Sequence, residues 1–128
     1  MNLLIVDDDQ GFAFLLKMEL EDQGHRVDTA SNGFDGRDLS QKISYDIIIL
    51  DLMLPGMNGR QVCRELRKKK KGTPVMIMSA LDSPDEREAC ISAGASDFMA
   101  KPFLFDDFYH KILLIDRNHR NNLDVAER

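Results

Sequence analysis

Chemically reactive side chains follow several short apolar stretches of this sequence, each at the point where the stretch ends. They are Asp7, Asp8, Asp9, Asp51, Ser79 and Lys101. Taken singly, an aspartate in such a place is commonly a helix N-cap, a serine a turn hydroxyl and a lysine a solvated charge. Taken together, they offer carboxylates, a hydroxyl and a cation that could act on one ligand.

Two or three carboxylates that lie close together repel one another, and their pKa values rise unless a cation lies among them. Mg²⁺ is the favoured cation, because it accepts one or two carboxylates and keeps water that a phosphate can displace. Lys101 and Ser79 would add a positive charge and a hydroxyl donor at the same point. This combination predicts a metal-dependent site that binds a phosphoryl group.

The elements that must position these residues alternate between strand and helix patterns. Strands are expected at 3–6, 26–29, 46–51, 74–78 and 98–100, and each is followed by a helical pattern, the last over 105–116. The stretch 46–51 is apolar without alternation, as in the middle of a parallel sheet. Right-handed crossovers then predict a parallel sheet covered by helices on both faces. Ligands bind at the carboxyl ends of the strands of such sheets, where the reactive residues lie.

Length and charge narrow the class of protein. The chain has 128 residues, and we expect one domain over 1–116 and a polar tail or the start of a linker over 117–128. Its net charge of −5 gives no support for direct nucleic-acid binding, which normally needs a basic face. No apolar run approaches the roughly 20 residues of a membrane span, and the first residues lack a signal-peptide pattern. We therefore expect no membrane association and a cytoplasmic location.

Four segments resemble, in order and spacing, the receiver domain of bacterial two-component response regulators: "LLIVDDD", "DIIILDLMLPGMNG", "VMIMSA" and "AGASDFMAKPF". The resemblance covers about residues 2–116. It implies a flavodoxin-like, doubly wound α/β fold with a five-stranded parallel sheet in the order 2-1-3-4-5 and five helices. It also implies a signalling domain and not an enzyme, one that catalyses only its own phosphotransfer and slow autodephosphorylation.

The resemblance also assigns the phosphoacceptor and the metal ligands. Asp51 would accept a phosphoryl group from the phosphohistidine of a sensor histidine kinase or of a histidine phosphotransfer protein. Asp8 would bind Mg²⁺ directly, and Asp7 is expected to do so through a water molecule. Asp51 itself and the backbone carbonyl of Met53 would be further ligands. Asp9 would begin a helix and would not bind the metal.

Lys101 and the switch residues complete the assignment. By the same resemblance, Lys101 contacts the acyl phosphate, and we expect a cis Lys101–Pro102 bond because the lysine must point back toward the carboxylates. Ser79 would hydrogen-bond the phosphate in the active state and move toward it. Phe98 would turn into the vacated space, although it lacks the hydroxyl that many relatives carry there. The surface that changes would be formed by 85–93, 98–100 and 105–115, and it could also bind an output domain or a second copy.

Two alternatives from other classes stay open at this point. A small phosphatase of the haloacid-dehalogenase type would use Asp7 as nucleophile, Asp9 as general acid, and Ser79 and Lys101 as phosphate ligands. That assignment leaves Asp51 without a role. An inert receiver-like interaction module is the other alternative, and the complete set of acidic, hydroxyl and lysine residues argues against it.

A basic run, "RELRKKKK" at 64–71, closes the third helical pattern. Its simplest interpretation is a solvated helix end whose cations complement the helix macrodipole. Docking onto an acidic partner surface is the other interpretation.

Overall fold

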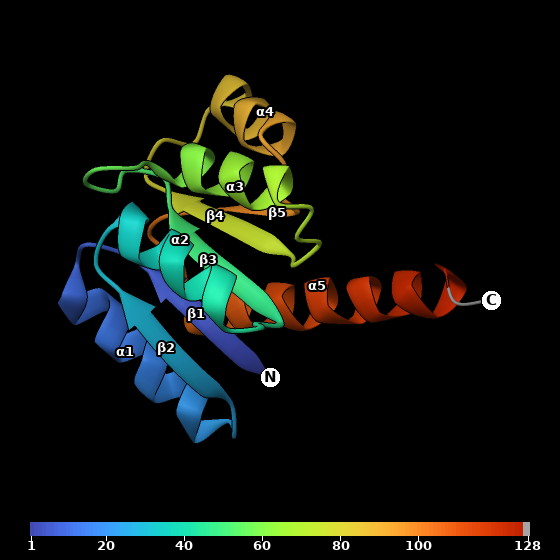
Figure 1. Ribbon diagram of the computed structural model, residues 1–128. Helices are drawn as coiled ribbons and strands as arrows, with labels where there is room; N and C mark the ends of the chain where they lie inside the picture. The colour runs from blue at the N-terminus through green and yellow to red at the C-terminus, as the bar shows by residue number, and fades with distance from the viewer. Residues whose placement is uncertain (127–128) are drawn as a thin grey trace.

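Five parallel strands form a single sheet in the order β2-β1-β3-β4-β5 (Figure 1). The computed structural model describes the backbone of residues 1–126 and the side chains of residues 1–123. The strands are β1 (Asn2–Val6), β2 (Arg26–Ala30), β3 (Ile47–Asp51), β4 (Val75–Ser79) and β5 (Asp97–Ala100). The predicted fold class and strand order are therefore confirmed.

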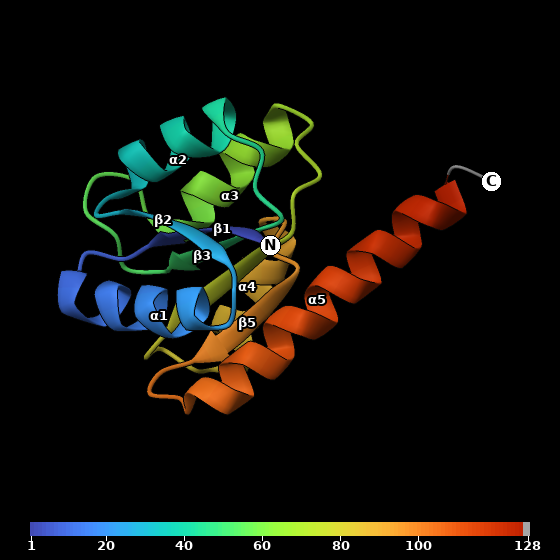
Figure 2. The same cartoon turned by 90° about the horizontal axis from the view of Figure 1, so that it is seen from below.

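Helices cover both faces of the sheet. They are α1 (Gln10–Asp22), α2 (Gly33–Lys42), α3 (Gly59–Lys68), α4 (Pro84–Ser92) and α5 (Phe105–Ala126). Apolar residues of α1 and α5 pack on one face, and apolar residues of α2, α3 and α4 pack on the other. Figure 2 shows α1 and α5 together on the same side of the sheet. None of the described helices has both the length and the apolar character that a membrane crossing needs.

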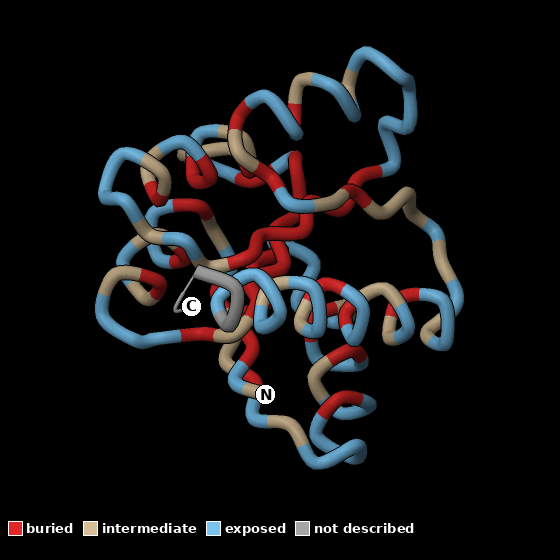
Figure 3. The backbone as a smooth tube through the Cα atoms, turned by 90° about the vertical axis from the view of Figure 1, so that its right-hand side faces the viewer, coloured by how far each residue is buried: buried red, intermediate tan, exposed pale blue. Residues whose placement is uncertain are grey.

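The central strands are apolar on both faces because both faces are covered. In β3, Ile48 and Leu50 belong to the core beneath α3, whereas Ile47 and Ile49 belong to the core beneath α1 and α5. Successive side chains of a strand point to opposite faces, so burial of both faces removes any alternation. Figure 3 shows the buried segments gathered at the centre of the molecule.

Polar side chains begin four of the helices by accepting backbone N–H groups. Asp9 accepts from the third residue of α1, Asn32 and Asn58 do the same for α2 and α3, and Ser83 does so for α4. Such N-caps satisfy donors that the helix itself leaves free. Asp9 thus begins a helix, as predicted, and Pro84 occupies the first turn of α4.

The predicted end of the last helix near Asp116 is wrong, because α5 continues to Ala126. Figures 1 and 2 show its final turns projecting beyond the sheet. The segment after Asp116 is polar, yet it contains neither glycine nor proline to end a helix. Arg120 also pairs with Asp116 one turn earlier at 3.0 Å, which supports the helix locally. A division of the chain at residue 116 stays a prediction.

Arg67 is the exception to the solvated reading of the basic run. Its guanidinium group donates to the backbone oxygen of Gly94 at 2.8 and 3.1 Å and to those of Lys71 and Thr73 at 2.6 and 2.9 Å. It therefore ties the end of α3 to the end of α4. For Arg67 the solvated interpretation is wrong, because its guanidinium group is hydrogen-bonded to these backbone carbonyls.

The loop between β3 and α3 is fixed against the start of α2. The N–H of Gly33 donates to the oxygen of Pro55 at 3.4 Å, and a Cβ at Gly33 would lie 1.8 Å from the oxygen of Met57. Gly56 has a φ of +77° and lies against the ring of Phe34. Only glycine permits both the close approach and the left-handed backbone. This contact holds the loop that follows Asp51.

Candidate functional site

The carboxyl ends of four neighbouring strands bring the predicted residues together. The strands pair in register, with Val6 opposite Leu50, Asp51 opposite Met78 and Ser79 opposite Ala100. Each reactive residue ends its strand or lies within three positions after it, so sheet topology places them along one edge. The predicted convergence is confirmed.

Three aspartates form a cluster of oxygen ligands. One carboxylate oxygen from each of Asp7, Asp8 and Asp51 lies within 4.8 Å of the other two. Asp7 is completely buried and Asp51 nearly so, whereas Asp8 is exposed. Hard oxygen donors of negative charge, two of them taken out of water, are the donor set that Mg²⁺ accepts. The residues present therefore fit this ion, and Asp9, turned to its capping role, lies outside the cluster.

Lys101 supplies the positive charge of the site. Its Nζ donates to Oδ2 of Asp7 at 2.8 Å and lies 3.6 Å from Oδ2 of Asp51. The Lys101–Pro102 bond is cis, as predicted. Asp7 also accepts the N–H of Asp9 on its other oxygen at 2.9 Å. Each oxygen of Asp7 thus has a protein donor, and Asp51 is the less constrained of the two buried carboxylates.

Burial is the main cause that raises the pKa of Asp51 above its ordinary value of 3.8. The charge of Asp7 raises this pKa further, Lys101 and a hydrogen bond from the backbone of Met53 lower it, and the exposed Asp8 raises it least. A single lysine therefore does not neutralise the cluster. A divalent cation among the same oxygens would relieve the remaining repulsion.

Ser79 and Phe98 lie beside the cluster in a specific arrangement. The buried Ser79 hydroxyl accepts the N–H of Leu81 at 2.9 Å. The ring of Phe98 is only 2% exposed. The ring is thus already buried, and the structure shows only this one position of it. The rotation of Phe98 on phosphorylation stays a prediction.

Sequence patterns missed Arg87, which covers Phe98, and Asp82, which pairs with Arg87. The guanidinium carbon of Arg87 lies 5.1 Å from the ring centroid, and Arg87 Nε donates to Oδ1 of Asp82 at 2.5 Å. Arg87 stands in α4 among acidic neighbours, and Asp82 stands in the preceding loop. Neither position carries a sequence signal beyond the opposite charges five residues apart.

Phe12 was also missed as a site residue, since its spacing indicates only a core position in α1. Its ring lies beside Lys101.

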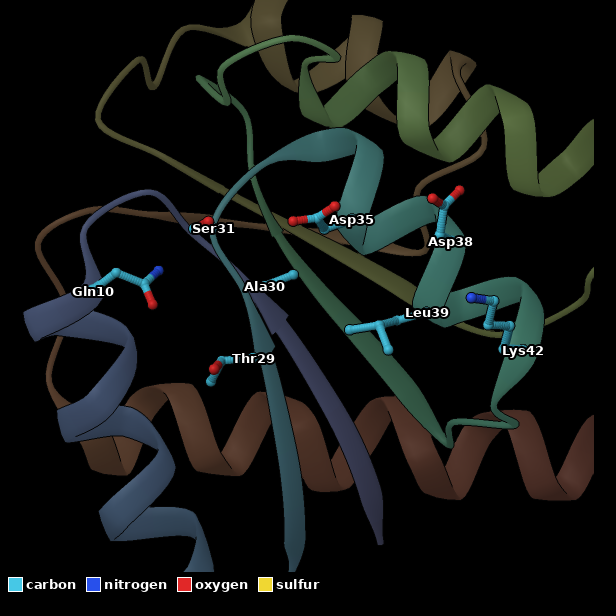
Figure 4. Close-up of a pocket in the computed structure, with 8 residues that line it drawn as sticks. All are labelled: Gln10, Thr29, Ala30, Ser31, Asp35, Asp38, Leu39 and Lys42. Atoms are coloured by element: carbon cyan, nitrogen blue, oxygen red, sulfur yellow. The ribbon is translucent and has the colours of Figure 1, made fainter.

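A groove of about 420 Å³ lies beside the edge strand β2 and outside the aspartate cluster. Figure 4 shows its lining side chains, which come from β2, the turn that follows it, α2 and the first turn of α1. Gln10 connects the groove to the site, because its Nε2 donates to the backbone oxygen of Asp7 at 2.7 Å.

Comparison with known proteins decides the family. The sequence matches the response regulator receiver domain over residues 3–113. The chain belongs to the response regulator receiver family. It is 39% identical over 115 residues to the response regulator ArlR of Staphylococcus aureus, an alignment that covers 90% of this chain and 52% of that protein. The chain thus spans about half the length of the curated relatives it matches.

Solved receiver domains share the fold over nearly the whole chain. The receiver domain of a putative LuxO repressor from Vibrio parahaemolyticus superposes with a TM-score of 0.91 at 28% identity, covering 99% of this chain and 97% of that one. The receiver domain of the Francisella response regulator 1452 gives 0.88 at 30% identity, covering 92% and 98%. A receiver domain is a signalling domain of two-component systems with an acidic pocket for Mg²⁺. The phosphatase and inert-module alternatives are not favoured.

Proposed function

We propose that this receiver domain is a phosphorylation switch in which Asp51 accepts the phosphoryl group and Mg²⁺ is required. The observation that carries the proposal is the unequal engagement of the two buried carboxylates. Lys101 donates to Asp7 at 2.8 Å, whereas it lies 3.6 Å from Asp51, beyond a good hydrogen bond. The Asp51 side chain is 12% exposed and that of Asp7 is not exposed at all. Of these two carboxylates, Asp51 is therefore the one that an incoming phosphorus atom can reach.

The transfer balances as a displacement at phosphorus. A carboxylate oxygen of Asp51 forms the new P–O bond while the P–N bond to the donor histidine breaks. The electron pair of that bond stays on the imidazole nitrogen, which takes up a proton. The product is an acyl phosphate on Asp51.

The other residues hold the charges that this product creates. Asp8, Asp51 and the backbone carbonyl of Met53 would hold Mg²⁺ directly, and Asp7 would do so through a water molecule. When bound, the ion supplies positive charge to the phosphoryl oxygens and to the surrounding carboxylates. Lys101 would pair with a phosphoryl oxygen, and Ser79 would exchange its contact with Leu81 for a hydrogen bond to the phosphate.

The proposed partners follow from this chemistry. The donor would be a sensor histidine kinase or a histidine phosphotransfer protein, and the place of action the cytoplasm, as is typical of response regulators. The output would leave through the face of α4, β5 and α5, either to an output domain or to a second copy of this chain. The share of ArlR that this chain spans supports an output segment in a longer protein. The domain would catalyse nothing beyond its own phosphotransfer and slow autodephosphorylation.

The test is to locate the phosphoryl group after treatment with acetyl phosphate and Mg²⁺. Intact-mass measurement should show one added phosphoryl group that hydroxylamine releases, and fragmentation should assign it to Asp51. Asp51→Asn should abolish the label, and EDTA should prevent it. Label on Asp7 would instead revive the phosphatase alternative, and absence of label from the folded wild type would reject the proposal.

A further inference from the structure

The Lys101 ammonium group has a third neighbour besides the two buried carboxylates. The centroid of the Phe12 ring lies 4.5 Å from Nζ, well within the range of a cation–π contact. Phe12 stands in the first turn of α1, and its backbone N–H donates to Asp9, the N-cap of the helix, at 3.1 Å. This N-cap hydrogen bond thus fixes the position of the Phe12 ring relative to the carboxyl ends of the strands.

The orientation of the Phe12 ring is set by a second aromatic residue. The rings of Phe12 and Phe103 meet edge to face at a centroid distance of 5.7 Å, and Phe103 stacks in turn on Phe108 at 5.2 Å. Phe108 is completely buried in the core beneath α1 and α5. The ring beside Lys101 is therefore braced by the core and is not a free surface side chain.

A lysine needs such support because its ammonium group is carried on four flexible methylenes. Asp7 and Asp51 attract the ammonium group of Lys101, but Asp51 must change its contacts when it accepts a phosphoryl group. The two carboxylates alone therefore do not keep the ammonium group in place. An aromatic face attracts a cation through its quadrupole and also excludes water. An aliphatic side chain of similar size would exclude water without attracting the charge.

We propose that Phe12 is a positioning residue for the phosphotransfer, holding the Lys101 ammonium group at the place where it meets the phosphoryl group on Asp51. The proposal rests on the proposed function and deepens it. Phe12 does not touch the reacting atoms; it acts through Lys101. Its contribution is the attraction of the ring face for the cation and not the apolar area that it buries.

The test compares rates of Asp51 labelling by acetyl phosphate at saturating Mg²⁺. Phe12→Leu should slow labelling by about threefold to tenfold, the range expected for loss of one partly desolvated cation–π contact. Phe12→Tyr keeps the ring face and should label at close to the wild-type rate. Phe105→Leu is the matched control, because Phe105 belongs to the same aromatic cluster but packs on Phe108 and Tyr109. Equal slowing by Phe105→Leu would overturn the proposal in favour of general packing.

Two further measurements separate the charge contact from fold effects. Replacing Phe12 with a fluorinated phenylalanine keeps its shape and weakens its quadrupole, so the rate should fall as fluorine atoms are added; an unchanged rate would overturn the proposal. In a Lys101→Met background, Phe12→Leu should have no further effect, and a slowing as large as in the wild type would also overturn it. If the wild type itself gains no label at Asp51, the proposed function fails first. If the wild type is labelled and Phe12→Leu matches its rate, only the positioning role fails.

Discussion

The ammonium nitrogen of Lys101 lies 2.8 Å from Oδ2 of Asp7, although 94 positions separate the two residues in the sequence. This pair neutralises a carboxylate that has no access to water. Asp51, at 3.6 Å from the same nitrogen, keeps a raised pKa because burial and the charge of Asp7 outweigh the lysine. Two neighbouring carboxylates thus differ in charge environment, and we expect this difference to affect stability, metal binding and phosphorylation.

The contribution of Asp51 to the stability of the metal-free protein should fall as pH rises through the titration of this carboxyl. Folding raises the pKa of this carboxyl above 3.8, so the folded state binds more protons than the unfolded state between 3.8 and the raised value. The loss of stability caused by the ionised Asp51 carboxylate is therefore absent below this pH window and complete above it. Asp51→Asn removes it, so in EDTA the melting temperature of the variant minus that of the wild type should grow with pH across the window. A difference that stays constant or shrinks would contradict the origin assigned to this pKa.

Mg²⁺ should stabilise the folded protein through Asp8. An ion that binds only the folded state adds about 2.7 kcal/mol at a hundredfold excess over its Kd. Asp8→Ala should lose most of this gain in thermal unfolding with added Mg²⁺. In EDTA the same variant should melt no lower than the wild type, because an exposed but repelling charge is removed; a clearly lower value would refute the repulsion argument.

The adjacent aspartate provides the control for this experiment. Asp9 caps α1 and lies outside the metal cluster, so Asp9→Ala should lower stability by about 1 kcal/mol with or without the ion. Its gain from Mg²⁺ should equal that of the wild type.

Ser79→Ala should accept phosphate at Asp51 yet lose most of the conformational response. A phosphoryl group can shift the equilibrium only through contacts that differ between the two states, and the Ser79 hydroxyl is the candidate contact. Amide NMR shifts with and without beryllofluoride, a phosphoryl mimic, should be large around Phe98 and Arg87 in the wild type and small in Ser79→Ala. Ser79→Thr keeps the hydroxyl and should retain them. If the amide shift changes in Ser79→Ala were as large as in the wild type, the switch mechanism would be wrong, whereas the phosphoacceptor assignment would stand.

Arg67→Met should destabilise the fold by about 2–4 kcal/mol, since it leaves the carbonyls of Gly94, Lys71 and Thr73 without their charged donor. Lys68→Met is the matched control: Lys68 follows directly in α3, and its side chain is 75% exposed with only a 4.0 Å contact to Glu65. Urea unfolding should show a change within about 0.5 kcal/mol for the control. Similar losses for the two variants would mean that Arg67 does not link α3 to α4.

Gly33→Ala should destabilise the protein and weaken Mg²⁺ binding together. Its Cβ would lie 1.8 Å from the backbone oxygen of Met57, so the loop that follows Asp51 must shift. Gly11→Ala, also in the first turn of a helix, places its Cβ no closer than 3.5 Å to Asp9 and should stabilise by about 0.5–1 kcal/mol. Calorimetric titration with Mg²⁺ checks the first effect, and unchanged affinity in Gly33→Ala would show that the loop does not contribute to the metal site.

Local patterns in the sequence were sufficient for the strands, the helix starts and the aspartate cluster. An unbroken apolar run such as Ile47–Leu50 predicts a strand buried on both faces, and Ser83 before Pro84 predicts a helix start, because both signals act between near neighbours. Once the sheet is parallel, the residues that end its strands must share one edge. Asp7, Asp8 and Asp51 could therefore be placed together without coordinates.

The direction of long side chains and the end of α5 were decided only by the tertiary structure. In the sequence, Arg67 cannot be distinguished from the neighbouring lysines of the basic run. In the fold its side chain turns inward, because the end of α4 brings the carbonyl of Gly94 within hydrogen-bonding distance. Phe12 reads as a core residue, yet its ring lies against Lys101 because Phe103 and the N-cap fix its position. α5 continues past Asp116 because Arg120 pairs with Asp116 one turn earlier and also lies 3.9 Å from Asp46, which directly precedes β3. The sequence by itself determines which atoms can react and at which edge; packing between distant elements decides which of them face one another.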